Sequence, residues 1–346
     1  MEFLKKQYQG VLFVAIISTF AFFLSSFESA KSLHLSPLVI GIVIGIIIAN
    51  TLGDKIPSSF SEGIRFSAKK ILRFAIVFYG FRITFSQIAD VGAEGFLVSL
   101  VMVVSTFIIG SYFGMKFFGL DRDTAMLTAS GASVCGAAAV LATEPVLKAQ
   151  EHKVAVAVAM VVLFGTISMF LYPILYATIF SKADGFLHLS PESFGIYVGG
   201  TIHEVAQVVA VSTINGADTA MAHNGVIVKL TRVLLIAPML IILSIYLAKT
   251  SKDKTVKTEI VVPWFAVYFI MVAGFNSLHL VPQNIVDIIN EIDTFLLTMA
   301  MTALGMGTIF SKFKGLGLAP IYTALSMFVW LVVGGFLITK LVVEVL

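Results

Sequence analysis

Eleven long apolar segments follow one another along the chain, and they constrain its fold more than any other feature. They cover residues 11–27, 37–52, 71–88, 95–117, 124–147, 154–180, 191–213, 224–248, 261–279, 294–311 and 316–343. About 20 helical residues cross the hydrocarbon core of a bilayer. Backbone groups inside a membrane must bond to one another, so such segments form helices. The sequence therefore predicts an all-α membrane protein of about 11 spans.

Composition excludes several other classes of protein. Hydrophobic residues make up 58% of the chain and charged residues only 12%, whereas soluble domains carry roughly 25% charged residues. This balance excludes a soluble domain and gives no basis for binding nucleic acid. Cys135 is the single cysteine, so an intrachain disulfide and a multi-cysteine metal site are excluded. We expect no metal and no other cofactor.

Basic residues between the spans predict an orientation in the membrane. With the N-terminus inside, the cytoplasmic segments carry fifteen lysines and arginines, whereas the outer loops carry three: Lys31, Lys148 and Lys153. Positive charge accumulates on the cytoplasmic side of membrane proteins. We therefore expect a cytoplasmic N-terminus and an external C-terminus. The segment 11–27 is expected to be a span rather than a cleaved signal, because no small-residue cleavage site follows it.

Three short similarities indicate an internal repeat. Residues 33–37 (LHLSP) match residues 187–191, Lys70 and Arg73 match Lys229 and Arg232, and 123–128 match 293–298. The matches keep their order, so spans two to six pair with spans seven to eleven. Five is an odd number, so paired spans cross in opposite directions, as in many secondary transporters. We expect an extra helix at 1–32, a first repeat at 33–180 and a second at 187–346.

The fifth span contains a stretch of small residues that predicts an interrupted helix. Five of them are candidates for a binding site: Ser130, Gly131, Ser133, Cys135 and Gly136. The repeat pairs this stretch with the tenth span, where the candidates are Thr302, Gly305, Gly307 and Thr308. Paired interruptions at corresponding positions point to a transport site. The alternative is a close helix crossing through small residues.

An anion is the ligand that this arrangement favours. Asp123-Thr124 and Asp293-Thr294 are candidate N-caps of the two broken spans. If both spans are interrupted, the N-termini of two half-helices point into the membrane centre from opposite sides. Each N-terminus carries about half a positive charge and free N–H groups.

Polar residues in the seventh span form a second candidate group. They are Thr201, His203, Glu204 and Gln207. On a helix, His203 and Gln207 would share a face. Intramembrane ionisable residues are typical of substrate pathways and proton relays, so His203 and Glu204 are candidate proton carriers. The alternative is a hydrogen-bonded cluster that joins helices. A zinc protease is disfavoured, because its motif needs a second histidine at the position of Gln207.

Cations near the ends of the spans are candidates for attracting an anion. They are Lys229, Arg232 and Arg73. Alternatively, such side chains extend to lipid headgroups. Arg82 is expected to pair with Asp90 or Glu94.

Three motifs resemble those of a known family. Residues 131–145 (GASVCGAAAVLATEP), 200–210 (GTIHEVAQVVA) and 228–233 (VKLTRV) resemble the YeiH-type family of bacterial inner-membrane proteins, over essentially the whole chain. The family name implies export of sulfate or a related sulfur oxyanion across the inner membrane. The architecture is also similar to that of sodium/proton antiporters and bile-acid symporters, with two unwound helices crossing at the centre; that likeness concerns the fold alone.

The leading functional hypothesis is a secondary transporter of a small, sulfate-like anion that works by alternating access. The alternatives are a cation/proton antiporter and a sodium-coupled organic anion symporter. An enzyme is disfavoured, because the sequence shows no paired catalytic aspartates and no metal-binding set. The lipid bilayer is the expected surrounding, and the extra first span leaves a homodimer open.

Overall fold

The structure, a computed structural model, describes residues 2–27, 36–216, 219–250, 264–313 and 317–345. All regular elements in these ranges are helical, as the sequence predicted. The chain divides into two compact units, and each is described by itself. Unit 1 consists of residues 1–89, 213–218 and 264–313; unit 2 consists of residues 90–212, 219–263 and 314–346.

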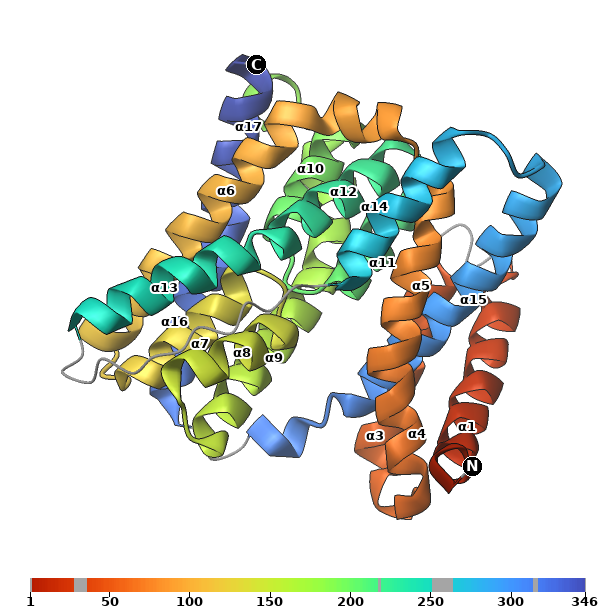
Figure 1. Ribbon diagram of the computed structural model, residues 1–346, viewed down its shortest axis with the longest axis horizontal. Helices are drawn as coiled ribbons and strands as arrows, with labels where there is room; N and C mark the ends of the chain where they lie inside the picture. The colour runs from red at the N-terminus through yellow and green to blue at the C-terminus, as the bar shows by residue number, and fades with distance from the viewer. Residues whose placement is uncertain (1, 28–35, 217–218, 251–263, 314–316, 346) are drawn as a thin grey trace. The chain divides into compact units, whose positions relative to one another are not determined.

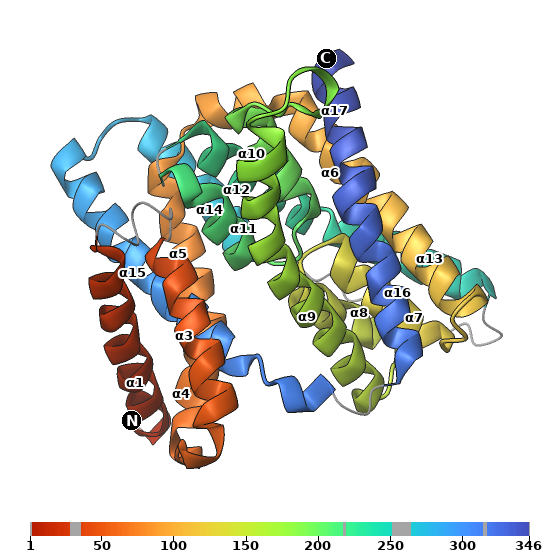
Figure 2. The ribbon, with the colours of Figure 1, turned by 180° about the vertical axis from the view of Figure 1, so that it is seen from behind.

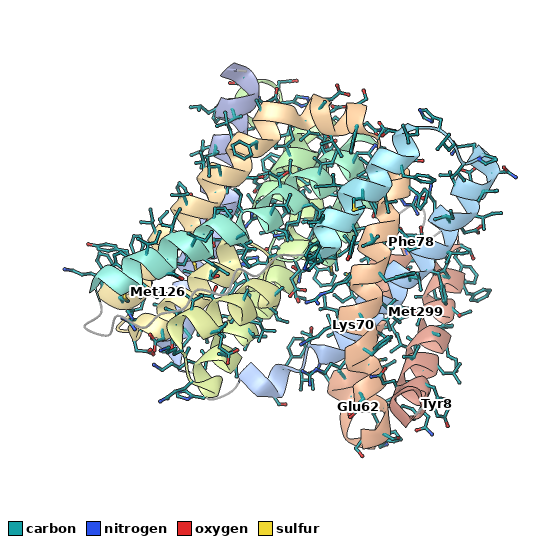
Figure 3. All side chains as sticks on the ribbon, in the orientation of Figure 1. Tyr8, Glu62, Lys70, Phe78, Met126 and Met299 are labelled. Carbon is teal, nitrogen blue, oxygen red and sulfur yellow. The ribbon has the colours of Figure 1, made fainter. Side chains whose placement is uncertain are left out.

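Six α-helices lie in the described residues of unit 1 and are labelled in Figure 1. They are α1 (Glu2–Ser25), α3 (Pro37–Thr51), α4 (Ser61–Phe66), α5 (Leu72–Phe78), α14 (Trp264–Ser277) and α15 (Gln283–Gly307). A π-helical turn, Ser67–Ile71, joins α4 to α5, and Lys70 lies on this turn (Figure 3). Met299 of α15, labelled in the same view, packs against Val14 and Ile17 of α1.

Glycines bring α3 and α15 into close contact, and the two helices lie side by side in Figures 1 and 2. A Cβ on Gly41 would lie 2.6 Å from Thr302 Oγ1, and Gly305 packs on the backbone of Ile42. The helix α15 runs unbroken through Gly305 and ends at Gly307, so the interruption that the sequence predicted within the tenth span is not found at Gly305. The small residues serve a close helix crossing, which was the alternative interpretation.

A buried ion pair also lies within unit 1. Arg82 Nε is 3.7 Å from Asp293 Oδ2, and Arg82 Nη2 donates to the Asn290 carbonyl and, at 2.7 Å, to Thr294 Oγ1. The predicted pairing of Arg82 with Asp90 or Glu94 is wrong. Asp293 lies inside α15, so the prediction that it caps a helix is wrong as well.

Unit 2 contains most of α6 and further α-helices, seen from behind in Figure 2. They are α6 (Phe85–Lys116), α7 (Arg122–Ser133), α8 (Ala137–Leu147), α9 (Glu151–Leu175), α10 (Pro191–Thr201), α11 (Val205–Ser212), α12 (Ala220–Leu234), α13 (Ile236–Thr250), α16 (Leu318–Val329) and α17 (Gly335–Val345). A π-helical turn, Tyr176–Phe180, extends α9, and another, Trp330–Gly334, joins α16 to α17.

Five helical stretches among the described residues are long and apolar enough to cross a membrane. They are Gln7–Ser25, Phe85–Lys116, His152–Phe180, Ala220–Leu247 and Leu318–Glu344. Shorter apolar helices cover Pro37–Thr51, Ala137–Leu147 and Trp264–Ser277. The total of 11 spans, the inverted repeat and the orientation stay predictions. Of the repeat's first match, residues 33–35 lie outside the described residues, but Ser36 and Ser190 cap α3 and α10 in the same way.

Candidate anion site in unit 2

The fifth span is interrupted where the sequence predicted it. The helix α7 ends at Ser133 and α8 begins at Ala137. Gly136 has φ +73° and ψ −137°, a conformation that only glycine adopts readily. The Gly136 N–H donates to the Gly131 carbonyl at 2.9 Å, which closes the end of α7. The cap of α7 is Asp121 rather than Asp123, because its carboxylate accepts the Asp123 and Thr124 N–H groups.

The seventh span is also interrupted, and the sequence did not predict this. The helix α10 ends at Thr201 and α11 begins at Val205, so His203 and Glu204 lie between two half-helices. The expectation that His203 and Gln207 share a helix face is therefore wrong. Gln207 Oε1 instead accepts the Glu204 N–H at 3.2 Å, which is half of a capping box at the start of α11. The second broken helix of this protein is thus the seventh span and not the tenth.

Two fully buried cations hold the ends of the interrupted helices. Lys229 and Arg232 have 0% exposure and lie three residues apart on α12, so they share one face. Lys229 Nζ donates to the Val134 carbonyl at 2.5 Å and to the Ile202 carbonyl at 2.8 Å. Lys229 therefore bridges the end of α7 and the end of α10.

Arg232, like Lys229, bonds to carbonyl groups at the ends of both α7 and α10. Its guanidinium donates to the carbonyls of Ala132, Ser133, Gly199 and Ile202, at distances from 2.6 to 3.4 Å. The last carbonyls of a helix have no partner within it, and the C-terminus carries about half a negative charge. The predicted location of these cations at the mouths of the spans is wrong, because both side chains are buried and bound to backbone. Their attraction for an anion stays a prediction.

Most hydroxyls of the two interruptions are used in structure. Ser130 Oγ lies 2.6 Å from Thr143 Oγ1 and so ties α7 to α8. Ser133 Oγ donates to the Ser130 carbonyl at 3.1 Å, and Thr201 Oγ1 donates to the Tyr197 carbonyl at 2.5 Å. Gly131 packs against Val140 and Val161. These side chains hold the interruptions together.

Two of the buried side-chain polar atoms that lack a hydrogen-bond partner among the described residues belong to the α10–α11 interruption and the start of α11. His203 Nδ1 and Gln207 Nε2 have no hydrogen-bond partner there, although the two residues are 2% and 0% exposed. Gln207 occupies the space beside Gly165 of α9, where a Cβ would lie 2.8 Å from Nε2. Gly165 was missed by the sequence analysis, because no motif marks it. Unpaired buried polar groups are costly and call for a ligand or water.

The remaining sequence candidates belong to unit 1. Thr302 Oγ1 accepts from Ser18 Oγ at 3.2 Å and donates to the Thr298 carbonyl. The Thr308 carbonyl accepts from Asn50 Nδ2 at 2.8 Å, and Gly307 lies at the end of α15. Arg73 lies 5.9 Å from the Phe265 ring. The structure therefore gives these residues roles in helix packing and capping within unit 1.

Comparison with known proteins places the chain in a family. The model of a family described as conserved hypothetical protein 698 matches residues 9–324. A UPF0324 membrane protein of Bordetella pertussis is 46% identical over 336 residues, which cover 96% of this chain and 94% of the relative. The chain belongs to the UPF0324 family.

Other relatives of this UPF0324 chain are similar to the same degree. The UPF0324 inner membrane protein YeiH of Escherichia coli K12 is 45% identical over 327 residues, or 94% of this chain and 91% of the relative. A UPF0324 membrane protein of Bacteroides thetaiotaomicron is 43% identical over 335 residues, with 96% and 97% covered. The resemblance to the YeiH-type family is thus confirmed, and the chain is a membrane protein.

Proposed function

We propose that this protein is a secondary transporter, not an enzyme, and that it carries a small sulfur oxyanion such as sulfate through the interruptions of unit 2. The observation that carries the proposal is the bonding of Lys229 and Arg232 to the carbonyl ends of α7 and α10. These bonds neutralise the negative ends of the half-helices. The N-terminal ends of α8 and α11 then attract an anion.

The unpaired polar atoms of His203 and Gln207 support the same ligand. His203 and Gln207 are buried at the start of α11 and can replace part of the water that a sulfate ion loses on entering the membrane. A buried charge is costly unless it is paired and hydrogen-bonded. Lys229 and Arg232 supply two positive charges beside the one carboxylate of Glu204. This balance favours an anion over a metal cation as the ligand and so weakens the sodium/proton antiporter alternative.

Export is the direction that the membrane potential favours. A dianion that leaves a cell with a negative interior gains about 4.6 kcal/mol per 100 mV, twice the value for one charge. We place the protein in a bacterial inner membrane, which is where the name of YeiH places that relative. The proposed orientation keeps the N-terminus in the cytoplasm.

Flux in liposomes tests the proposal. The purified protein is reconstituted, and movement of labelled sulfate, sulfite and taurine is measured under an imposed potential and under a pH gradient. We expect saturable flux of sulfate or sulfite that the potential accelerates. Sodium-driven proton movement without any anion flux would contradict the proposal and favour the antiporter.

A further inference from the structure

Glu204 is the acidic residue of the α10–α11 interruption, and its side chain lies at the start of α8. It is 9% exposed, and a Cβ on Gly136 would lie 2.5 Å from Glu204 Cγ and 3.0 Å from Oε1. Gly136 directly precedes the first turn of α8. A helix N-terminus stabilises a carboxylate for the same reason that it stabilises a bound anion. Glu204 and an incoming anion therefore compete for one place.

The balance of charges limits what the interruptions can accept. Two helix C-termini and two helix N-termini, with about half a charge each, cancel one another. Lys229 and Arg232 add two positive charges, and an ionised Glu204 removes one of them. A dianion would leave this buried region negative. With Glu204 neutral, the dianion balances the two cations.

We propose that a dianion binds in unit 2 together with one proton, which the Glu204 carboxylate takes up. An acid of the aqueous buffer gives up the proton and becomes its conjugate base, a new O–H bond forms on Glu204, and no bond in the anion changes. This inference rests on the proposed function, because it concerns the same site. Glu204 therefore competes with the anion in a way that depends on its protonation. The ionised carboxylate occupies the start of α8, whereas the protonated carboxyl group leaves that place to the anion.

Other ionisable groups surround Glu204 and must be separated from it. Cys135 approaches from the α7–α8 interruption, Lys229 from α12 with Arg232 one turn further on, and His203 precedes Glu204 in the chain. The helix α9, which places Gly165 beside Gln207, has no ionisable side chain from Val154 to Leu171. His203 adjoins Glu204 in the chain, so a variant of His203 is needed to separate the two side chains as proton acceptors.

Calorimetry of sulfate binding tests the inference. Purified protein in nanodiscs is titrated with sulfate in two buffers of different ionisation enthalpy, which gives the number of protons taken up per sulfate. We expect about one proton for the wild type, and an affinity that falls up to about tenfold per pH unit as the pH rises. Glu204→Gln should bind sulfate without proton uptake and without this pH dependence. The exposed matched control, Glu192→Gln, should behave as the wild type does.

Other results would contradict either the inference about Glu204 or the proposed function, and the two cases can be distinguished. If Glu204→Gln keeps the proton uptake, or if His203→Gln alone loses it, the inference is wrong and the proposed function stands. If the wild type binds no sulfate at any pH, the proposed function fails and the inference falls with it. If Glu204→Gln does not fold, infrared difference spectra of the wild type decide: sulfate should produce the C=O band of a protonated carboxyl group, and the absence of that band overturns the inference.

Discussion

Units 1 and 2 both bury charged side chains, but they stabilise them in different ways. In unit 1, Arg82 faces the carboxylate of Asp293 beside an unbroken helix. In unit 2, Lys229 and Arg232 bond to the carbonyl ends of interrupted helices. A broken helix thus supplies negative charge from its own backbone. Unit 2 can hold two cations with one carboxylate nearby, which leaves positive charge to attract an anion.

The largest expected loss of stability follows from removing Arg232, whose partners are backbone carbonyls rather than a carboxylate side chain. Arg232→Leu removes a donor from the buried carbonyls of Ala132, Ser133 and Gly199, whereas the Ile202 carbonyl keeps Lys229. Each unpaired buried group costs about 1–3 kcal/mol, so we expect the free energy of unfolding to fall by at least about 3 kcal/mol. Thermal unfolding in detergent measures it, with Arg73→Leu as a control of small effect. Equal stability of the two variants would contradict the role given to Arg232.

The ion pair in unit 1 should show a different pattern of rescue. Arg82→Leu leaves Asp293 buried without its cation and should cost about 3–5 kcal/mol. The double variant Arg82→Leu/Asp293→Leu should recover most of this loss, because both charges are gone. Glu204→Leu should not rescue Arg232→Leu in the same way. If the same unfolding experiment shows that Glu204→Leu restores the stability of Arg232→Leu, the two units stabilise their buried cations in the same way and the comparison is wrong.

Alanine substitutions of two glycines, Gly136 and Gly307, should change the free energy of unfolding by intermediate amounts. Gly136→Ala places a side chain at φ +73° and against Glu204, so we expect a loss of more than about 1–2 kcal/mol. A Cβ added to Gly307 in α15 would meet no described atom within 4 Å. Gly307→Ala should therefore be neutral or slightly stabilising. Sulfate flux and thermal unfolding of both variants test whether the interruption depends on glycine conformation.

The smallest effect concerns the surface pair at the start of α7. Lys153 Nζ lies 2.6 Å from Asp121 Oδ1. Burial alone would raise the pKa of Asp121, but hydrogen bonds from Lys153 and Thr124 outweigh it and lower that pKa to about 2. The unfolded value is about 3.9, so this stabilisation is present above about pH 4 and is lost as the pH falls toward about 2.

Lys153→Met should remove most of this acid dependence and cost less than about 1 kcal/mol near neutral pH, as exposed ion pairs do. Unfolding midpoints between about pH 2 and pH 6 provide the measurement. A variant with the same acid profile as the wild type would show that Lys153 does not hold Asp121.

The sequence predicted the helical membrane fold and the interruption at Gly136, because small residues in an apolar segment favour a break. It misplaced the second interruption, because glycine serves both unusual backbone conformations and close helix contacts. Gly305 serves the second purpose, and its neighbour Ile42 is far away in the chain. The interruption at His203 has no glycine or proline at residues 202–204. The partners of Arg232 lie up to 100 residues away, so no local pattern reveals them.

The central claim is that the anion binds at the interruptions of unit 2 and not on α15 in unit 1. Cys135, the single cysteine, lies within the first interruption, so a membrane-permeant maleimide reports on this place without further substitution. We predict that sulfate slows the labelling of Cys135 in reconstituted protein, whereas chloride at equal ionic strength does not. In a Cys135→Ala background, labelling of a Thr302→Cys variant should not respond to sulfate. A Cys135 labelling rate that saturating sulfate leaves unchanged would contradict the account.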